Sequence, residues 1–208
     1  MNPGCFITLE GIEGVGKSTQ SRFIVDWLQK HGKTVVATRE PGGTPAAEAM
    51  RAILLQHWDE TITPETELLL LFAGRSQHVT HVIHPALQRG DWVVCDRFTD
   101  ASYAYQGYAR GVSREWIAAL EREVQHGLQP DITFLLDAPV VIGSERAKAR
   151  NQQTDRFEAE KHSFFEKVRL GYLALAEAQP HRFRVIDASL SQEHVQQEIE
   201  QHLWAMIT

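Results

Sequence analysis

The amino-acid sequence predicts a three-layer α/β fold, in which a parallel sheet of five strands is covered by helices on both faces. Three observations support this prediction. Short apolar segments alternate with longer helical ones, a glycine-rich segment joins the first strand to the first helix, and polar residues follow the strands. Such alternation is typical of parallel sheets, because the chain must cross back over the sheet between two parallel strands, and this crossover usually contains a helix.

The elements can be placed in order along the chain. The strands are expected at Cys5–Glu10, Thr34–Thr38, Trp92–Cys95, Ile132–Leu136 and Phe183–Ile186. The helices are expected at Ser18–Lys30, Ala46–Leu55, Glu65–Leu87, Arg114–Gly127, Val140–Ala149, Ser163–Ala178 and Gln192–Ile207. With 208 residues and no repeat or linker, the chain is expected to form one domain over residues 1–208.

Composition limits the class of protein. Hydrophobic residues make up 43% of the chain, enough for a substantial core, but the apolar runs are too short and too often broken by charge to span a membrane. The net charge of −6 argues against a nucleic-acid polymer as the partner. Cys5 and Cys95 are expected to be free thiols in a reducing cytosol. Residues 1–4 do not resemble the start of a signal peptide, so a cytoplasmic location is expected.

The segment from Gly11 to Ser18 fits the phosphate-binding pattern G-x-x-x-x-G-K-[ST] in full. It stands between a predicted strand and a predicted helix, which lets backbone N–H groups and the helix N-terminus face phosphate oxygens. Lys17 can reach the β and γ phosphates, and the Ser18 hydroxyl is suited to hold Mg²⁺. A glycine-rich turn that binds nothing is the alternative. Because pattern and context agree, the sequence predicts a P-loop fold that binds a nucleoside triphosphate.

Charged residues also follow the third strand. Asp96 can hold Mg²⁺ through water, and Arg97 can clamp a phosphate with two parallel hydrogen bonds. A solvent-facing ion pair at a strand end is the alternative, and the P-loop nearby favours function. Residues 99–110 are rich in hydroxyls and tyrosines, which suits either a nucleoside pocket or an ordinary helix packed on its neighbours. Ligands of open parallel sheets bind beyond the carboxyl ends of the strands, where these residues lie.

Further arginines stand out from their surroundings. Arg75 ends a strongly apolar helical run, and core packing does not explain it. Arg146 and Arg150 share a helix face next to a polar stretch, residues 150–155, expected to be an exposed mobile loop. Mobile arginines that close over a γ-phosphate would stabilise transition-state charge. The alternative is that the helix dipole favours basic residues near a C-terminus.

This combination of motifs resembles the bacterial thymidylate kinases, a family of P-loop nucleoside monophosphate kinases. The resemblance rests on Leu9–Ser18, Arg39–Thr44, Asp96-Arg97-Phe98 with Ser102, Tyr105 and Gln106, and Asp155–Glu158. It implies Mg²⁺-dependent transfer of the ATP γ-phosphoryl group to dTMP, giving dTDP and ADP for dTTP biosynthesis. It also implies a lid at about residues 146–158 and a homodimer.

The resemblance assigns roles to particular residues. The expected ATP-binding residues are Gly11, Ile12, Glu13, Gly14, Val15, Gly16, Lys17, Ser18 and Thr19. The expected dTMP-binding residues are Glu13, Arg51, Phe72, Arg75, Arg97, Ser102, Tyr105 and Gln106. The expected catalytic residues are Lys17, Arg97, Arg146 and Arg150, and the expected metal ligands are Ser18 and Asp96.

Individual functions follow from the same resemblance. Glu13 would accept a hydrogen bond from the sugar 3′-hydroxyl, and Tyr105 would lie against C2′ and disfavour a ribonucleotide. Arg51 and Arg97 would grip the dTMP phosphate. Arg75 would donate to a thymine carbonyl, while Gln106 would bind another part of the base edge.

The chain departs from many family members at two places. Residues 12–15 of the P-loop contain no arginine, so the lid is expected to supply the catalytic one through Arg146 or Arg150. The thymine-stacking aromatic residue of many members lies four positions before the base-binding arginine, where this chain has Leu71. Phe72 is expected to stack on thymine instead.

Two other functions remain open at this point. A deoxynucleoside kinase would phosphorylate a neutral hydroxyl, which would leave Arg51 and Arg97 without a phosphate to bind. A regulatory module would bind ATP without transferring a phosphoryl group.

Overall fold

The computed structural model describes residues 4–149, 156–157 and 160–207. All strands of its five-stranded sheet run parallel, in the order β2-β3-β1-β4-β5. They are β1 (Phe6–Glu10), β2 (Val35–Arg39), β3 (Trp92–Asp96), β4 (Ile132–Asp137) and β5 (Phe183–Asp187). The predicted α/β class and all five strands are confirmed. Four strands end one residue later than predicted, because the polar residue that follows the apolar run still belongs to the strand.

The helices connect the strands and cover the sheet. They are α1 (Lys17–Lys30), α2 (Pro45–Leu55), α3 (Pro64–His78), α4 (His84–Gln88), α5 (Thr99–Ser102), α6 (Arg114–Gln125), α7 (Val140–Ala149), α8 (His162–Ala178) and α9 (Gln192–Ile207). Two π-helical segments, η1 (Val79–Ile83) and η2 (Tyr103–Ala109), continue α3 and α5. At the start of α2, the Thr44 side chain accepts a hydrogen bond from the Ala47 amide, and Pro45 occupies the first turn.

The predicted uniform helix over residues 65–87 is wrong in detail. The structure has α3, the π-helical η1 and the short α4 in its place. Pro85 lies in the first turn of α4 and has no N–H to donate to a preceding carbonyl, so the regular pattern is interrupted there. The predicted end of the helix at Gly127 is also late. His126, with φ 50°, follows α6 in the left-handed conformation that ends helices.

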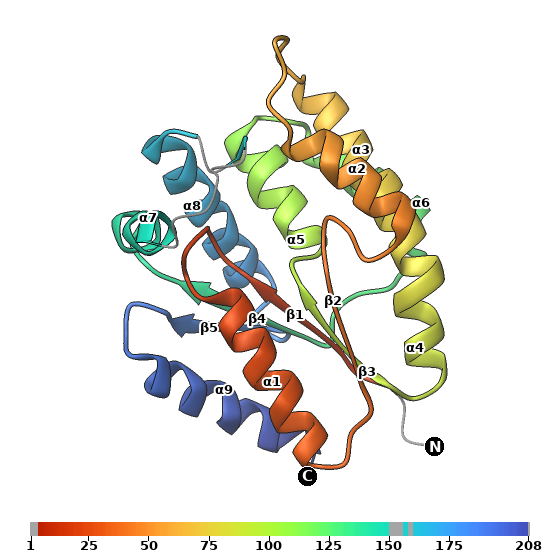
Figure 1. Ribbon diagram of the computed structural model, residues 1–208, viewed down its shortest axis with the longest axis vertical. Coiled ribbons are helices and arrows are strands. Elements are labelled where there is room, and N and C mark those ends of the chain that lie inside the picture. Colours follow the sequence, from red (N-terminus) through yellow and green to blue (C-terminus); the bar gives the residue numbers. More distant parts are fainter. Residues whose placement is uncertain (1–3, 150–155, 158–159, 208) are drawn as a thin grey trace.

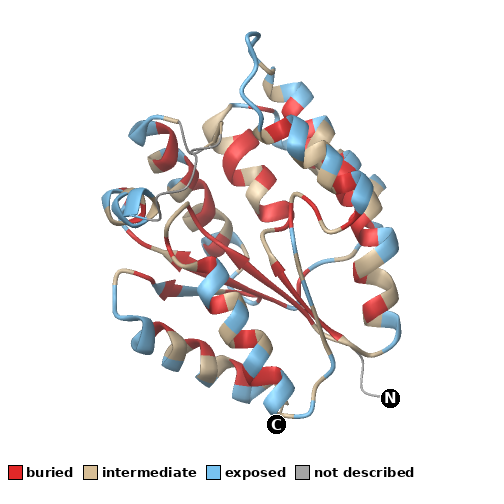
Figure 2. Ribbon diagram, viewed as in Figure 1, coloured by how far each residue is buried: buried red, intermediate tan, exposed pale blue. Residues whose placement is uncertain are grey.

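Alternating strand residues face opposite layers of helices. Ile7, Leu9 and Val94 belong to a core cluster that includes residues of α1 and α9, whereas Val93 and Cys95 pack with η1 and α4. In Figure 1, α1 and α9 lie on one face of the sheet, and α4, α5 and α8 lie on the other. Figure 2 shows that the central strands are buried, while exposed residues lie on the outer faces of the helices.

Two expectations from composition can be compared with the structure. Within the described ranges, no helix is both long and apolar enough to cross a membrane. Cys95 is buried, Cys5 is partly buried, and both are free thiols.

Candidate active site

The P-loop lies between β1 and α1, as its sequence context predicts. Its Lys17 side chain is buried, and Nζ donates to the carbonyl oxygens of Gly11 at 3.1 Å and Ile12 at 2.7 Å. Burial, which removes hydration from the charged ammonium, and the nearby charge of Arg97 together lower the pKa of Lys17 to about 8. An anionic ligand beside Nζ would stabilise the charged form again.

The P-loop packs closely against the first turns of α7. Gly14 has φ 76°, and a Cβ atom there would lie 1.9 Å from the carbonyl oxygen of Gly143. A Cβ atom on Gly143 would lie 2.5 Å from the carbonyl oxygen of Glu13. Only glycine fits at either position, so α7 is docked directly on the phosphate-binding loop. The sequence analysis missed Gly143, since a single glycine in a helix has no distinctive spacing.

Docking of α7 brings Arg146 into the P-loop cavity. Arg146 lines this cavity together with Lys17, Ser18 and Thr19, and its Nη1 donates to the Ala188 carbonyl oxygen at 2.7 Å. Arg150, the second expected arginine of the lid, lies outside the described residues, as does the expected mobile loop of residues 150–155.

The expected metal ligands lie next to each other at this cavity. The Ser18 hydroxyl at the start of α1 donates to Asp96 Oδ2 at the end of β3, over 3.3 Å. A hydroxyl and a carboxylate are oxygen donors of the kind that Mg²⁺ takes from proteins when phosphates and waters supply its other ligands. The pair therefore fits the ion that the motif predicts.

Arg97 connects the P-loop to the neighbouring helices. Its φ of 71° is unusual for a residue with a side chain. Nη2 donates to Glu13 Oε1 at 2.8 Å and to the Tyr105 hydroxyl at 3.0 Å, while Nη1 donates to the Tyr172 hydroxyl at 2.9 Å. The guanidinium is thus held on both sides before any ligand binds.

The buried carboxyl group of Glu10 holds two neighbours of Arg97 in place. Glu10, at the end of β1, accepts hydrogen bonds from the Phe98 amide and the Tyr172 hydroxyl, both at 2.7 Å. Burial and the nearby charge of Asp100 together raise the pKa of Glu10 to about 8. Neither Glu10 nor Tyr172 was predicted as a site residue. Glu10 directly precedes the P-loop motif, but Tyr172 lies on α8 and has no sequence signal.

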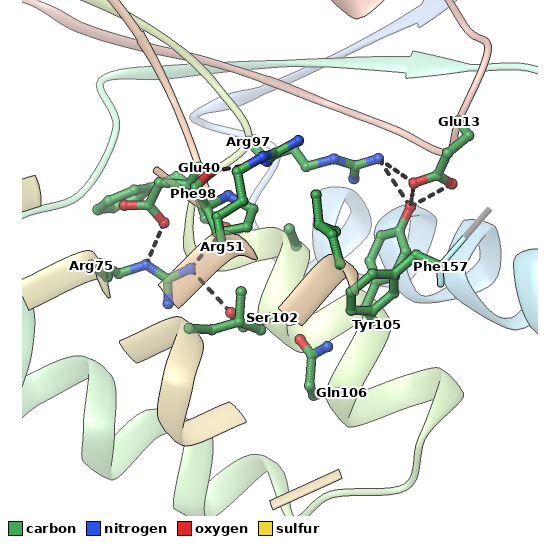
Figure 3. Close-up of a pocket in the computed structure, with 14 residues that line it drawn as sticks. Glu13, Glu40, Arg51, Arg75, Arg97, Phe98, Ser102, Tyr105, Gln106 and Phe157 are labelled. Carbon is green, nitrogen blue, oxygen red and sulfur yellow. Dashed lines mark hydrogen bonds and ion pairs between the residues drawn. The ribbon is translucent and has the colours of Figure 1, made fainter. Parts of the chain in front are cut away.

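A second cavity lies beside the P-loop, between α2, α3 and η2. Its lining includes Arg75, Ser102, Tyr105 and Gln106, all of them predicted site residues (Figure 3). Arg75 is 2% exposed; Nε donates to Glu40 Oε2 at 2.7 Å and Nη2 to Ser102 Oγ at 3.1 Å. Glu40, from the loop after β2, therefore fixes Arg75, a role that the sequence analysis did not assign.

Two polar atoms of this cavity have no hydrogen-bond partner among the described residues. They are Arg75 Nη1, a donor, and Gln106 Oε1, an acceptor. Gln106 is fixed at its other end, because Nε2 donates to Glu67 Oε1 at 2.6 Å. Buried polar groups without partners are rare in folded proteins and often belong to ligand sites.

The structure corrects the expectation for Phe72. Its side chain is 2% exposed and packs with Leu68, Val112 and Ile117, and it is not part of the lining described for the cavity. Leu71 and Phe157 line the cavity instead. The Phe72 ring lies 4.5 Å from Arg75 Cζ, so it supports the arginine. One position along a helix turns a side chain by about 100°, which separates Leu71 from Phe72.

The two cavities share one wall. Glu13, Glu40, Arg51 and Arg97 line both of them. Arg51, on α2, donates through Nη1 to the Pro41 carbonyl oxygen at 2.9 Å. Two guanidinium groups therefore stand where a ligand in the second cavity would meet a phosphate chain held by the P-loop.

Comparisons with known proteins point to one family. The family model described as thymidylate kinase matches residues 9–199. A thymidylate kinase of Chromohalobacter salexigens is 57% identical over 204 residues, which cover 98% of this chain and 96% of the relative. One of Methylococcus capsulatus is 60% identical over 188 residues, covering 90% and 89%.

The chain belongs to the thymidylate kinase family. Its fold agrees with a member solved by crystallography, the thymidylate kinase from Ehrlichia chaffeensis, with a TM-score of 0.80 and 33% identity over 97% of this chain and 100% of that one. A thymidylate kinase is a phosphotransferase that acts on dTMP. The predicted family and reaction are therefore confirmed.

Proposed function

We propose that the P-loop cavity binds ATP with Mg²⁺, that the second cavity binds dTMP, and that the γ-phosphoryl group passes between them at the wall they share. The observation that carries this proposal is the pair of buried atoms without partners, Arg75 Nη1 and Gln106 Oε1, in a cavity that adjoins Arg51 and Arg97. One end of the cavity suits a base edge, and the other suits a phosphate.

The base edge of thymine has the complementary pattern. A carbonyl oxygen, O4, stands next to an N–H group, N3–H, so the base can accept from Arg75 Nη1 and donate to Gln106 Oε1. Cytosine has an amino group and a bare nitrogen at the same places, which would oppose donor to donor and acceptor to acceptor. A site built to pair such groups rejects the mismatched analogue strongly, because buried polar atoms are then left unpaired.

The phosphates have separate holders. Lys17 and the P-loop amides are placed for the ATP phosphates, and Arg51 and Arg97 for the dTMP phosphate. Phosphoryl transfer needs little covalent chemistry from the protein, so holding donor and acceptor in line and neutralising charge supply most of the effect. Ser18 and Asp96 would hold Mg²⁺, which supplies charge neutralisation on the phosphate oxygens when bound.

The sugar and the lid complete the site. The Tyr105 hydroxyl lies 2.8 Å from each Glu13 oxygen, which supports a shared role for both residues at the sugar of dTMP. Arg146 already lines the P-loop cavity and can neutralise charge on ATP. For Arg150 the proposal rests on the sequence: we expect Arg150→Ala to lower kcat more than it raises KM.

A coupled ADP-release assay tests the proposal. With ATP and Mg²⁺, kcat/KM should be highest for dTMP, lower for dUMP, and far lower for dCMP, dGMP and the ribonucleotide. Turnover of thymidine but not of dTMP would instead support a deoxynucleoside kinase and would contradict the assignment of Arg51 and Arg97 to a phosphate.

We further propose a cytoplasmic homodimer. The family resemblance supports it, and so do exposed apolar side chains on two helices that pack together, Ile53 of α2 and Leu69 of α3. Light scattering coupled to gel filtration should give about twice the chain mass of 23.6 kDa. A monomer mass at micromolar concentration would contradict the proposal.

A further inference from the structure

A buried carboxylate stands directly behind the base-binding glutamine. Glu67, in the first turn of α3, is fully buried. Its Oε1 accepts from Gln106 Nε2 at 2.6 Å, and its Oε2 accepts from Arg156 Nη2 at 2.7 Å. Arg110 Nε lies 3.5 Å from Oε1. The two guanidinium groups lie close enough to compensate the buried charge of the Glu67 carboxylate.

This contact decides which end of the Gln106 amide faces the cavity. The two ends of a glutamine side chain are nearly equal in size, but one donates and the other accepts. A carboxylate accepts only. Nε2 must therefore face Glu67, and Oε1 is left as the free acceptor. Reversing the amide would set its oxygen against the carboxylate and leave both without a hydrogen.

We propose that Glu67 is a positioning residue that determines base specificity: it holds the Gln106 amide so that an acceptor faces the base, which selects a base with an N–H at that place over one with a bare nitrogen. This inference rests on the proposed role of Gln106. Glu67 itself lies behind Gln106 and does not touch the base. It does not line the cavity in the described structure.

Glu67→Gln separates this role from simple packing. The new side chain has almost the same shape, but it can donate as well as accept, so Gln106 can turn and present Nε2 to the bare nitrogen of cytosine. The ratio of kcat/KM for dTMP to that for dCMP should fall by about tenfold to a hundredfold, the effect of one or two hydrogen bonds. The ratio should stay above unity, because Arg75 still opposes the cytosine amino group.

The experiment uses four variants of the whole protein. Glu67→Gln and Gln106→Leu are measured singly and together, and Glu121→Gln is the matched control. On α6, Glu121 accepts hydrogen bonds from Gln129 Nε2 and the Tyr103 hydroxyl, outside the cavity lining. The control should leave the ratio unchanged, and Glu67→Gln should not lower it further once Gln106 is leucine.

The outcomes are distinct. If Gln106→Leu lowers the ratio but Glu67→Gln does not, the role of Glu67 is refuted while that of Gln106 stands. If Gln106→Leu leaves the ratio unchanged, the proposed base contact of Gln106 fails, and the inference fails with it. A further drop in the double variant would mean that Glu67 acts by another route, which also refutes the inference.

Glu67→Asp gives a second test, and it applies even where Glu67→Gln does not fold. Aspartate is shorter but still accepts only, so both kcat/KM values should decrease together and their ratio should stay within about threefold. A tenfold loss of the ratio in Glu67→Asp would show that shape, and not the acceptor character of residue 67, matters, and would overturn the proposal.

Discussion

Substitutions of Arg97 test whether its backbone conformation lowers the stability of the protein. Its φ of 71° lies in the left-handed region, which costs a residue with a side chain about 1–2 kcal/mol relative to glycine. Glycine also gives the unfolded chain more conformational freedom, which offsets about 0.4–1 kcal/mol of this advantage. Arg97→Gly should therefore be more stable than Arg97→Ala, by about 0.8 kcal/mol at the midpoints of these two ranges. Both variants lose the same hydrogen bonds to Glu13, Tyr105 and Tyr172.

Activity, in contrast, should fall equally in both variants. Removal of the guanidinium deletes the charge-assisted hydrogen bonds that we propose to the dTMP phosphate, which should cost about 2–4 kcal/mol of transition-state stabilisation in either variant. That corresponds to a loss of about 30-fold to 1000-fold in kcat/KM for dTMP. ATP binding should be retained, because Lys17 and the P-loop amides remain.

The assay pairs urea unfolding with steady-state kinetics. His126→Gly is the control, since His126 also has a positive φ, of 50°, but stands after α6 on the surface. His126→Gly should be more stable than the wild-type protein by a similar amount and should keep full activity. Equal stabilities of Arg97→Gly and Arg97→Ala would refute the strain argument, and unchanged kcat/KM in both would refute the phosphate contact.

Three further predictions concern the P-loop and its support. Gly143→Ala should push α7 away from the P-loop, cost about 1–3 kcal/mol in stability and raise KM for ATP; Gly74→Ala, whose new Cβ would meet ordinary contacts at 3.6 Å, should do neither. The lowered pKa of Lys17, about 8, means that ATP binding takes up a proton near that pH and weakens as pH rises above it. Calorimetry in two buffers should detect this uptake, and its absence would contradict the pKa. Glu10 has a pKa raised to about 8, so the folded state binds its proton more tightly and stability falls as pH rises from about 4.5 to 8. In chemical unfolding over this pH range, the free energy of unfolding should fall less for Glu10→Gln than for the wild-type protein. An equal fall in both proteins would disprove the raised pKa.

Much of the fold could be predicted from the sequence, because its signals are local. The alternation of apolar strands with helices sets the parallel sheet, and the glycines and Lys17 of the P-loop identify themselves by spacing. Features that depend on contacts between distant segments left no such signal. The approach of Gly143 to Gly14 and the hydrogen bond that Arg97 donates to Tyr172 join segments that lie far apart in the chain. The π-helical segments η1 and η2 likewise had no signal in the sequence.

Phe72 shows the limit within a single helix. The sequence places an aromatic residue one position from the expected stacking position, and either position could have been turned toward the cavity by a small rotation of α3. The structure fixes the rotation through Glu67, which must face Gln106 and Arg156, and through Arg75, which must face Glu40. Polar contacts of a helix thus decided which apolar residue lines the site.

Glu40 and Glu67 together explain how a base can be distinguished without a flexible site. Glu40 accepts a hydrogen bond from Arg75 Nε, which leaves Arg75 Nη1 as a donor without a partner among the described residues. Glu67 accepts one from Gln106 Nε2, which leaves Gln106 Oε1 as an acceptor in the same state. Each carboxylate is buried and is itself bound by a second cationic or imidazole group, Arg156 for Glu67 and His78 for Glu40. Because these partners lie outside the base contact, the donor and acceptor are fixed before dTMP arrives, and binding does not have to order them. Under the proposed base contacts, specificity depends also on the two carboxylates that hold Arg75 and Gln106, so substitution of Glu67, which does not line the cavity, should change base preference.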